Sequence, residues 1–359
     1  KITPYLSNYH SSTQSSIDPA TITGPPPLIP RIIHQTWFEE LSPSYRYPDL
    51  IRLQNSWRFF SSENKWEYRF YTDVHVREYI ATHYPTAILE AYDALLPGAY
   101  KADLFRYLVL LKDGGVYADI DIMLNVNLDA IIMPDTSFFA PRDSIGEYAD
   151  GNYCLWNGLI GSAPGHPFLL RAVERTVNLV IDRADALDME RHLCLKSGIA
   201  MESWKVRAGP NLLLSGPCAL GVSVNEALGK YPLSKFEVGL MDDSSYGRID
   251  SNAKTENIIR EDLIGSHYLI LMQDKWDLGA MRFTDPERQI VVATTDMPGL
   301  SKNPAHGDLQ HEKEKEVPRN TRLHYSVAAH GQMVWGSKHV YEDQLVREDQ
   351  YVFDLHYKI

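Results

Sequence analysis

The chain has 359 residues, 44% hydrophobic and 23% charged, so it can bury the core of a globular protein. Its 47 acidic residues outnumber its 35 basic ones, and the formal net charge of -12 argues against nucleic acid or an anionic membrane surface as a partner. No apolar run reaches the ~18 residues that span a bilayer. The three cysteines, Cys154, Cys194 and Cys218, lack the spacing of a zinc site and allow at most one disulfide.

Residues 1–28 are rich in Ser, Thr and Pro and have no apolar period, which predicts a flexible stem or linker. A single folded domain is then expected over residues 29–359. It should begin with a short buried strand at residues 31–34, with Trp37 just past its carboxyl end. Alternating side chains predict a second strand at residues 66–71.

Two helices should follow, one capped by Thr72 and reaching about residue 83, the other covering about residues 86–95. Apolar residues at helical spacing predict a further helix from residue 100 to the Gly114-Gly115 pair.

Residues 116–122 are expected to form the next strand, followed by a strand at 155–162 and a helix at 166–181. This alternation of strands and helices predicts an α/β sheet with a substantial parallel part. The polar stretch 284–320 is interpreted as a solvated loop excursion.

Asp119 and Asp121 are two residues apart in the strand expected at 116–122, so both carboxylates should point to one face. Like charges in a partly buried place raise each other's pKa unless a cation lies beside them. Their hard oxygen atoms favour Mg²⁺ or Mn²⁺. Such an ion would neutralise a bound diphosphate, which the acidic chain would otherwise repel. An Asp-x-Asp can equally be a polar strand end without a function, so the surrounding residues decide between the two interpretations.

The helix before this strand carries Lys101, Asp103 and Arg106, and the last two share a helix face. They could form a surface ion pair worth under ~1 kcal/mol. Alternatively, Arg106 contacts phosphate or sugar oxygens and Asp103 accepts sugar hydroxyls. The tight turn at residues 113–115 returns the helix to the Asp119 strand, where ligands of open α/β sheets collect, which favours the second interpretation. Trp37 is either a core ring or a platform for a base.

Several stretches resemble the retaining DXD-sugar glycosyltransferases, which include the fungal initiating α-1,6-mannosyltransferase, the inositolphosphoceramide mannosyltransferases and the clostridial glucosylating toxins. The matching stretches are residues 29–37 (IPRIIHQTW), 96–107 (LPGAYKADLFRY), 114–121 (GGVYADID), 157–158 (NG), 163–168 (APGHPF) and 208–210 (AGP). The resemblance implies a glycosyltransferase A fold, a single Rossmann-like mixed sheet flanked by helices. It makes residues 29–359 a catalytic domain that retains the anomeric configuration.

The resemblance also implies roles for single residues. Trp37 would stack on the base, Asp121 would bind the metal directly and Asn157 would stand near the reacting sugar. Catalysis would involve Asp103, Arg106, Asp119 and Asn157. The donor would contact Trp37, Lys101, Asp103, Arg106, Tyr117, Asp119 and Trp335. The metal would be bound by Asp119, Asp121 and His330. The family's C-terminal His-x-x-x-Gly-Ser-Trp pattern is matched only by residues 329–337 (AHGQMVWGS), in a different order, so His330 is weighed equally as a structural residue.

GDP-mannose is the first choice of donor, with Mn²⁺ or Mg²⁺ as cofactor and a glycan or glycolipid as acceptor. UDP-galactose, UDP-glucose and UDP-N-acetylglucosamine stay open as donors. By resemblance, the domain is expected to face the Golgi lumen, with a membrane anchor ahead of Lys1. A haloacid-dehalogenase-like phosphatase also uses an Asp-x-Asp, but Met123 stands where that family has Thr or Val. A catalytically idle sugar-nucleotide binding protein is the remaining alternative.

Overall fold

The computed structural model describes residues 26–43, 48–95, 98–143, 153–182, 213–242, 263, 266–276 and 280–295. Most of the expected stem lies outside these residues, as do residues 208–210, His330 and Trp335. Among the described residues, no helix has both the length and the apolar character needed to cross a membrane.

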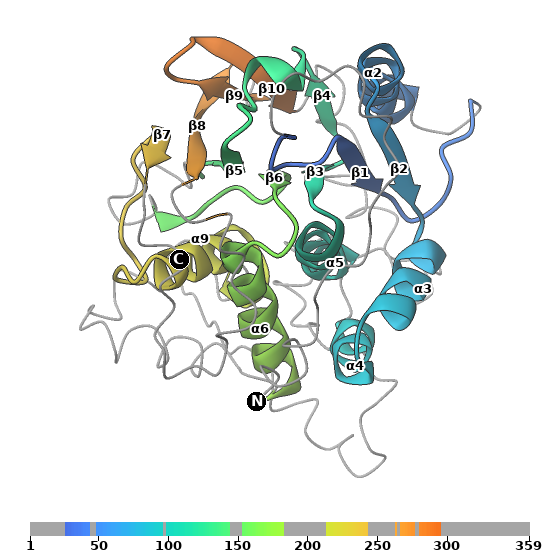
Figure 1. The fold of residues 1–359 in the computed structure, drawn as a ribbon. Helices are drawn as coiled ribbons and strands as arrows, with labels where there is room; N and C mark the ends of the chain where they lie inside the picture. Colours follow the sequence, from blue (N-terminus) through green and yellow to red (C-terminus); the bar gives the residue numbers. More distant parts are fainter. Residues whose placement is uncertain are drawn as a thin grey trace, which may run out of the picture.

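The described strands form one mixed sheet in the order β2-β1-β3-β6-β5-β8-β9-β10-β4, with β7 also paired to β8 (Figure 1). Strand β1 pairs in parallel with β2 and β3, and β5 pairs in parallel with β8, whereas the other pairings are antiparallel. The strands are β1 (Ile32–Thr36), β2 (Glu67–Tyr71), β3 (Gly115–Ala118), β4 (Ile122–Leu124), β5 (Thr136–Pro141), β6 (Leu159–Ser162), β7 (Gly239–Asp242), β8 (His267–Trp276), β9 (Ala280–Asp285) and β10 (Ile290–Thr295).

Helices cover both faces of the sheet, which confirms the mixed α/β fold expected from the sequence. Figure 1 shows α5, α6 and α9 below the sheet and α2 above it. The helices are α2 (Pro48–Asn64), α3 (Asp73–His83), α4 (Thr86–Ala94), α5 (Gly98–Asp113), α6 (Pro167–Ile181) and α9 (Pro217–Ala227), with a short 3-10 helix η2 (Leu128–Ala130). A disulfide between Cys154 and Cys218 ties the segment before β6 to α9.

Strand β3 separates two parts of the core, because successive side chains point to opposite faces. Tyr117 belongs to the buried cluster that includes residues of the helices α3 to α6 and α9. Val116 and Ala118 pack on the other face with Trp57 of α2. The alternation therefore aims Tyr117 toward α5, the helix that carries Asp103 and Arg106.

A glycine pair connects α5 to β3. Gly114 has a φ of +67°, and its N–H donates to the Leu110 carbonyl at 3.0 Å, which ends the helix. At Gly115 a side chain would collide with the Ile32 carbonyl of β1. His34 Nε2 donates to the Gly114 carbonyl at 2.9 Å, and burial lowers the pKa of His34 to about 3, so the ring is neutral. This turn fixes α5 against the central strands.

Three sequence expectations need correction. The strand expected at 116–122 is interrupted, because β3 ends at Ala118 and the Ile122 N–H closes a turn onto the Asp119 carbonyl at 3.2 Å before β4 begins. The strand expected at 155–162 begins only at Leu159. The excursion expected at 284–320 starts instead with the antiparallel pair β9 and β10, and its remainder lies outside the described residues.

Candidate active site

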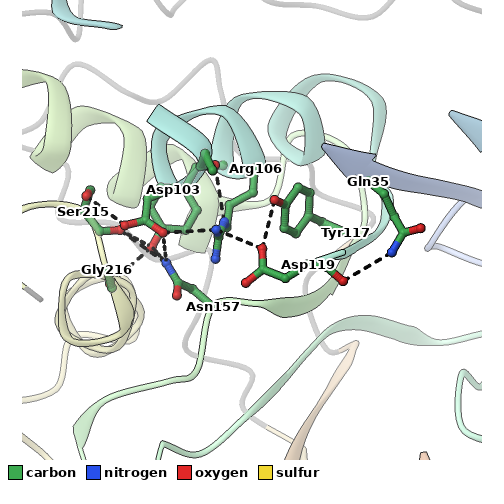
Figure 2. Close-up of polar contacts among 10 residues, drawn as sticks. Gln35, Asp103, Arg106, Tyr117, Asp119, Asn157, Ser215 and Gly216 are labelled. Carbon is green, nitrogen blue, oxygen red and sulfur yellow. Dashed lines mark hydrogen bonds and ion pairs between the residues drawn. The ribbon is translucent and has the colours of Figure 1, made fainter. Parts of the chain in front are cut away.

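The centre of the candidate site is an arginine held between two carboxylates. Asp103 and Arg106 lie one turn apart on α5 and are only 8% and 4% exposed. Arg106 Nη2 lies 3.2 Å from Asp103 Oδ1 and 3.1 Å from Oδ1 of Asp119, the residue that follows β3 (Figure 2). The guanidinium carbon also lies 4.8 Å from the centroid of the Tyr117 ring. The helix and the strand end are thus joined by one buried cation.

Asp119 is fixed by its neighbours on both the side chain and the main chain. The Tyr117 hydroxyl donates to Asp119 Oδ1 at 3.0 Å. The Asp119 N–H donates to the Gly158 carbonyl at 2.8 Å, and Gln35 Nε2 donates to the Asp119 carbonyl at 3.2 Å (Figure 2). These bonds come from three different strands or their ends, so the carboxylate is preorganised before any ligand arrives.

The charges of the cluster shift each other's pKa. Burial, together with the negative charges of Asp121 and Asp103, raises the pKa of Asp119 to about 7 against the opposing effect of Arg106. Its side chain nevertheless stays 31% exposed, so the desolvated carboxylate still has an open side. Burial also raises the pKa of Asp103, although Arg106 works against that shift. For Arg106, burial lowers the pKa but Asp119, Tyr117 and Asp103 outweigh it, and the guanidinium stays charged.

Asp121 does not share a strand face with Asp119, contrary to the expectation from spacing. It is half-buried and lies in the turn between β3 and β4. The two carboxylates still interact, because the charge of Asp121 is among the causes that raise the pKa of Asp119.

Asp119 and Asp121 suit a hard divalent cation in their chemistry, since carboxylate oxygens are the ligands that Mg²⁺ and Mn²⁺ prefer. The open, desolvated carboxylate of Asp119 fits that role. In the part of the chain that the structure describes, no group of three acidic, His or Cys side chains completes a metal shell. The third expected ligand, His330, falls outside that part.

Trp37 and Lys101, two other residues expected to contact the donor, are placed differently relative to the cluster. Trp37 directly follows β1 and packs, partly buried, against the small cluster that includes Ile120 of the Asp119–Asp121 turn. Lys101 points to a different side of α5 from Asp103. Its ammonium lies 5.0 Å from the ring centroid of Tyr92 on α4. Trp37 is thus adjacent to the site, whereas Lys101 is turned toward α4.

Asn157 joins the cluster from the segment before β6. Its Nδ2 donates to Asp103 Oδ1 at 2.9 Å and to the Tyr107 hydroxyl at 3.0 Å. Two residues that sequence reasoning missed complete the arrangement. Tyr107 donates to the Ser215 carbonyl at 2.6 Å, and Ser215 Oγ donates to Asp103 Oδ2 at 3.0 Å (Figure 2). The helical spacing from Asp103 could have found Tyr107, but Ser215 comes from a segment with no sequence signal.

Gly158 and Trp156 lie beside the Asp119 carboxylate, a contact that the sequence analysis did not predict. A Cβ atom at Gly158 would lie 2.5 Å from Asp119 Oδ2 and 2.5 Å from the Trp156 ring. The partly buried Trp156 ring stacks on Phe283 of β9, with centroids 4.4 Å apart. The missing side chain of Gly158 therefore leaves room for the Asp119 carboxylate beside the indole.

Comparison with known proteins finds a family match for the part of the chain that carries most of this cluster. Residues 34–138 match the family described as a glycosyltransferase sugar-binding region containing a DXD motif. The resemblance seen in the sequence is therefore confirmed, and Asp119-Ile120-Asp121 is an Asp-x-Asp tripeptide within the matched residues.

Individual relatives carry mannosyltransferase names. The chain is 35% identical to inositol phosphoceramide mannosyltransferase 3 of Schizosaccharomyces pombe over 40% of this chain and 36% of that protein. It is 31% identical to the initiation-specific α-1,6-mannosyltransferase of the same yeast over 35% of this chain and 32% of that protein. These alignments span well under half of either relative's length.

A solved UDP-bound glycosyltransferase domain from the YGT toxin shares 12% identity and a TM-score of 0.28, covering 52% of this chain and 56% of that one. That likeness is too low to support any inference about this chain.

Proposed function

We propose that the chain is the catalytic part of a metal-dependent, retaining glycosyltransferase that moves a hexose from a nucleoside diphosphate sugar to a glycan or glycolipid acceptor. Mannose from GDP-mannose is the first choice, supported by the mannosyltransferase names of the relatives. The observation that carries the proposal is the buried Arg106 between Asp103 and Asp119 beside the DXD turn.

Arg106 supplies the positive charge that a departing diphosphate needs. It is buried, stays charged and is held at a fixed position by two carboxylates, so it stabilises developing negative charge without reorganising. Tyr117 is fully buried and its hydroxyl donates to Asp119 Oδ1, so its part in the proposal is to hold that carboxylate in place.

Asp119 and Asp121 would hold Mn²⁺ or Mg²⁺, with His330 as the proposed third ligand. When bound, such an ion neutralises pyrophosphate oxygens. The chain's own contribution is to present carboxylates, one of them desolvated, next to a fixed arginine. This local arrangement counters the repulsion between a formal net charge of -12 and a phosphorylated donor.

The sugar of the donor would be held by Asp103 and Asn157. The Asp103 carboxylate is buried and can accept hydroxyl protons of a sugar, while Asn157 presents an amide next to it. Trp37 would stack on the base, with Lys101 and Trp335 as further donor contacts. This division assigns the base to the end of β1 and the sugar to α5 and the segment before β6.

The proposed location is the Golgi lumen, with a membrane anchor elsewhere in the full protein. The disulfide between Cys154 and Cys218 supports a luminal domain, because such bonds persist in oxidising compartments.

A donor-hydrolysis panel tests the proposal. The protein is incubated with GDP-mannose, UDP-glucose, UDP-galactose or UDP-N-acetylglucosamine, each with Mn²⁺ or with a chelator, and the released nucleoside diphosphate is measured. We expect metal-dependent release from GDP-mannose; selective release from a UDP-sugar would reassign the donor. Release of phosphate from simple phosphomonoesters would favour a phosphatase. Metal-dependent binding of a donor with no hydrolysis and no transfer would favour an idle binding protein.

A further inference from the structure

The Asp103 carboxylate receives hydrogen bonds from two segments that are far apart in the sequence. Asn157 Nδ2 donates to Oδ1 at 2.9 Å, and Ser215 Oγ donates to Oδ2 at 3.0 Å (Figure 2). Arg106 lies 3.2 Å from Oδ1 on the same helix. With both oxygens engaged, the plane of the carboxylate is fixed within the site.

Ser215 is itself held rigidly. Its side chain is fully buried, and its carbonyl accepts the Tyr107 hydroxyl at 2.6 Å. It lies two residues before α9, whose N-terminal Pro217 carbonyl accepts the Leu155 N–H at 3.0 Å. A side chain on Gly221 of α9 would collide with the Tyr153 carbonyl, so helix and segment are in direct contact.

The disulfide locks these two segments together. Cys154 lies three residues before Asn157, and Cys218 lies three residues after Ser215, with a sequence separation of 64 between the two cysteines. The bond therefore joins the two chain segments that hold Asp103 from either side. Neither segment belongs to α5. Their positions relative to Asp103 therefore depend on contacts outside that helix, and the disulfide is one contact that holds the two segments together.

We propose that Ser215 is a positioning residue for the sugar end of the donor, acting through Asp103, and that the Cys154–Cys218 disulfide keeps it in place. The inference rests on the proposed function, because it takes Asp103 as the group that accepts sugar hydroxyls. The Ser215 hydroxyl occupies Oδ2 and stabilises the ionised form of the carboxylate, so that the remaining acceptor capacity of Asp103 faces the ligand in one orientation.

The consequence is a selective effect on binding. Loss of the Ser215 hydroxyl removes a hydrogen bond to a charged group and frees the Asp103 carboxylate to rotate. The sugar should then bind more weakly, whereas the diphosphate and base, which Asp103 does not touch, should bind as before. A role in folding alone would not distinguish a sugar nucleotide from its nucleoside diphosphate.

The experiment compares Ser215→Ala with Ser223→Ala. Ser223 is also fully buried, belongs to α9 and donates to the Ala219 carbonyl at 2.7 Å within its own helix. Titration calorimetry with Mn²⁺ measures the affinity for GDP-mannose against GDP, and for UDP-glucose against UDP. We expect Ser215→Ala to weaken sugar-nucleotide binding about tenfold or more, with nucleoside diphosphate binding unchanged, and Ser223→Ala to change neither.

Two further measurements separate this role from a structural one. In the Asp103→Asn background, Ser215→Ala should cause no additional loss, because the two residues act as one unit. Reduction of the wild-type disulfide with a phosphine should reproduce the Ser215→Ala pattern and add nothing to that variant.

Equal losses for sugar nucleotide and nucleoside diphosphate would overturn the inference, as would unchanged binding by Ser215→Ala when the wild type binds. If the wild type binds none of these ligands with Mn²⁺, the proposed function fails first and the inference falls with it.

Discussion

Arg106 and Asp119 come from a helix and from the end of a strand, and the guanidinium Nη2 lies 3.1 Å from the carboxylate Oδ1. The same Nη2 also lies 3.2 Å from Asp103. One buried cation thus contacts both carboxylates, and its removal would leave both without their shared counter-charge.

Replacing Arg106 by Ala should lower turnover a hundredfold or more, typical of losing a preorganised charge-stabilising group. Arg106→Lys should recover little, because an ammonium cannot match the planar contacts with two carboxylates. The measurement is kcat for donor hydrolysis. Arg175→Ala is the matched control: its side chain is 4% exposed, against 5% for Arg106, and it pairs with Glu226. That variant should lose stability and keep its kcat.

Asp121→Asn should abolish transfer and metal-dependent donor binding while leaving the fold intact, because Asp121 lies in a half-buried turn rather than in the core. Circular dichroism and donor titration with Mn²⁺ would check both parts. The control is Asp129→Asn, an acidic residue of η2 paired with Arg31 at 3.1 Å, which should bind donor normally. Near-normal activity of Asp121→Asn would remove this residue from the metal site.

The raised pKa of Asp119 predicts a pH dependence of metal affinity. Burial raises this pKa to about 7, so below that value a proton competes with the metal for the carboxylate. Mn²⁺ affinity should fall about tenfold for each pH unit below that pKa, as for one titrating group. The rise in Tm that Mn²⁺ causes should therefore be larger at about pH 8 than at about pH 5.5, and Asp119→Asn should remove the difference.

Asp143 offers a control for this effect, since burial also raises its pKa to about 7. A raised carboxyl pKa stabilises the folded state fully below the unfolded value near 3.9, and this contribution is lost as pH rises through about 7. Without metal, the free energy of unfolding of Asp143→Asn should therefore fall less than that of the wild type as the pH rises from near 3.9 to about 7. It should leave the Mn²⁺-induced shift of Tm unchanged; a reduced shift would mean that Asp119 is not the relevant group.

Gly158→Ala should damage the site through one added methyl group. The Cβ would lie 2.5 Å from Asp119 Oδ2 and 2.5 Å from the Trp156 ring, so one of them must move. We expect at least a tenfold lower kcat, with a stability cost of about 1–3 kcal/mol as for other overpacked sites. Gly229→Ala is the control, because nothing lies within 4 Å of its Cβ and only its φ of +68° is strained. That variant should lose stability and retain its kcat.

Among the elements up to α6, the sequence predicted most clearly those whose ends carry a local cap or turn residue. Thr72 forms a capping box with His75 at the start of α3, and the Gly114-Gly115 pair ends α5, so both helices could be bounded from residue types alone. Asp103, Arg106 and Asp119 were likewise brought together by a turn that is visible in the sequence.

The errors have a common physical cause, which is that local alternation does not report a turn or a distant partner. The alternating residues 116–122 suggested one strand, yet Ile120 turns into a separate apolar cluster with Leu50 and Leu53 of α2. The stretch 284–320 was interpreted as a polar loop, although Ile290–Thr295 form β10 and residues 286–289 are only the turn that connects β9 to it. Ser215 could not be found because its contact with Asp103 spans 112 residues.

The stretch shared with the DXD family stops at residue 138, whereas Asn157 and Ser215, which hold Asp103, come later in the chain. The two side chains that hold Asp103 from outside α5 therefore come from chain segments beyond the matched residues 34–138, and the Cys154–Cys218 disulfide joins these segments.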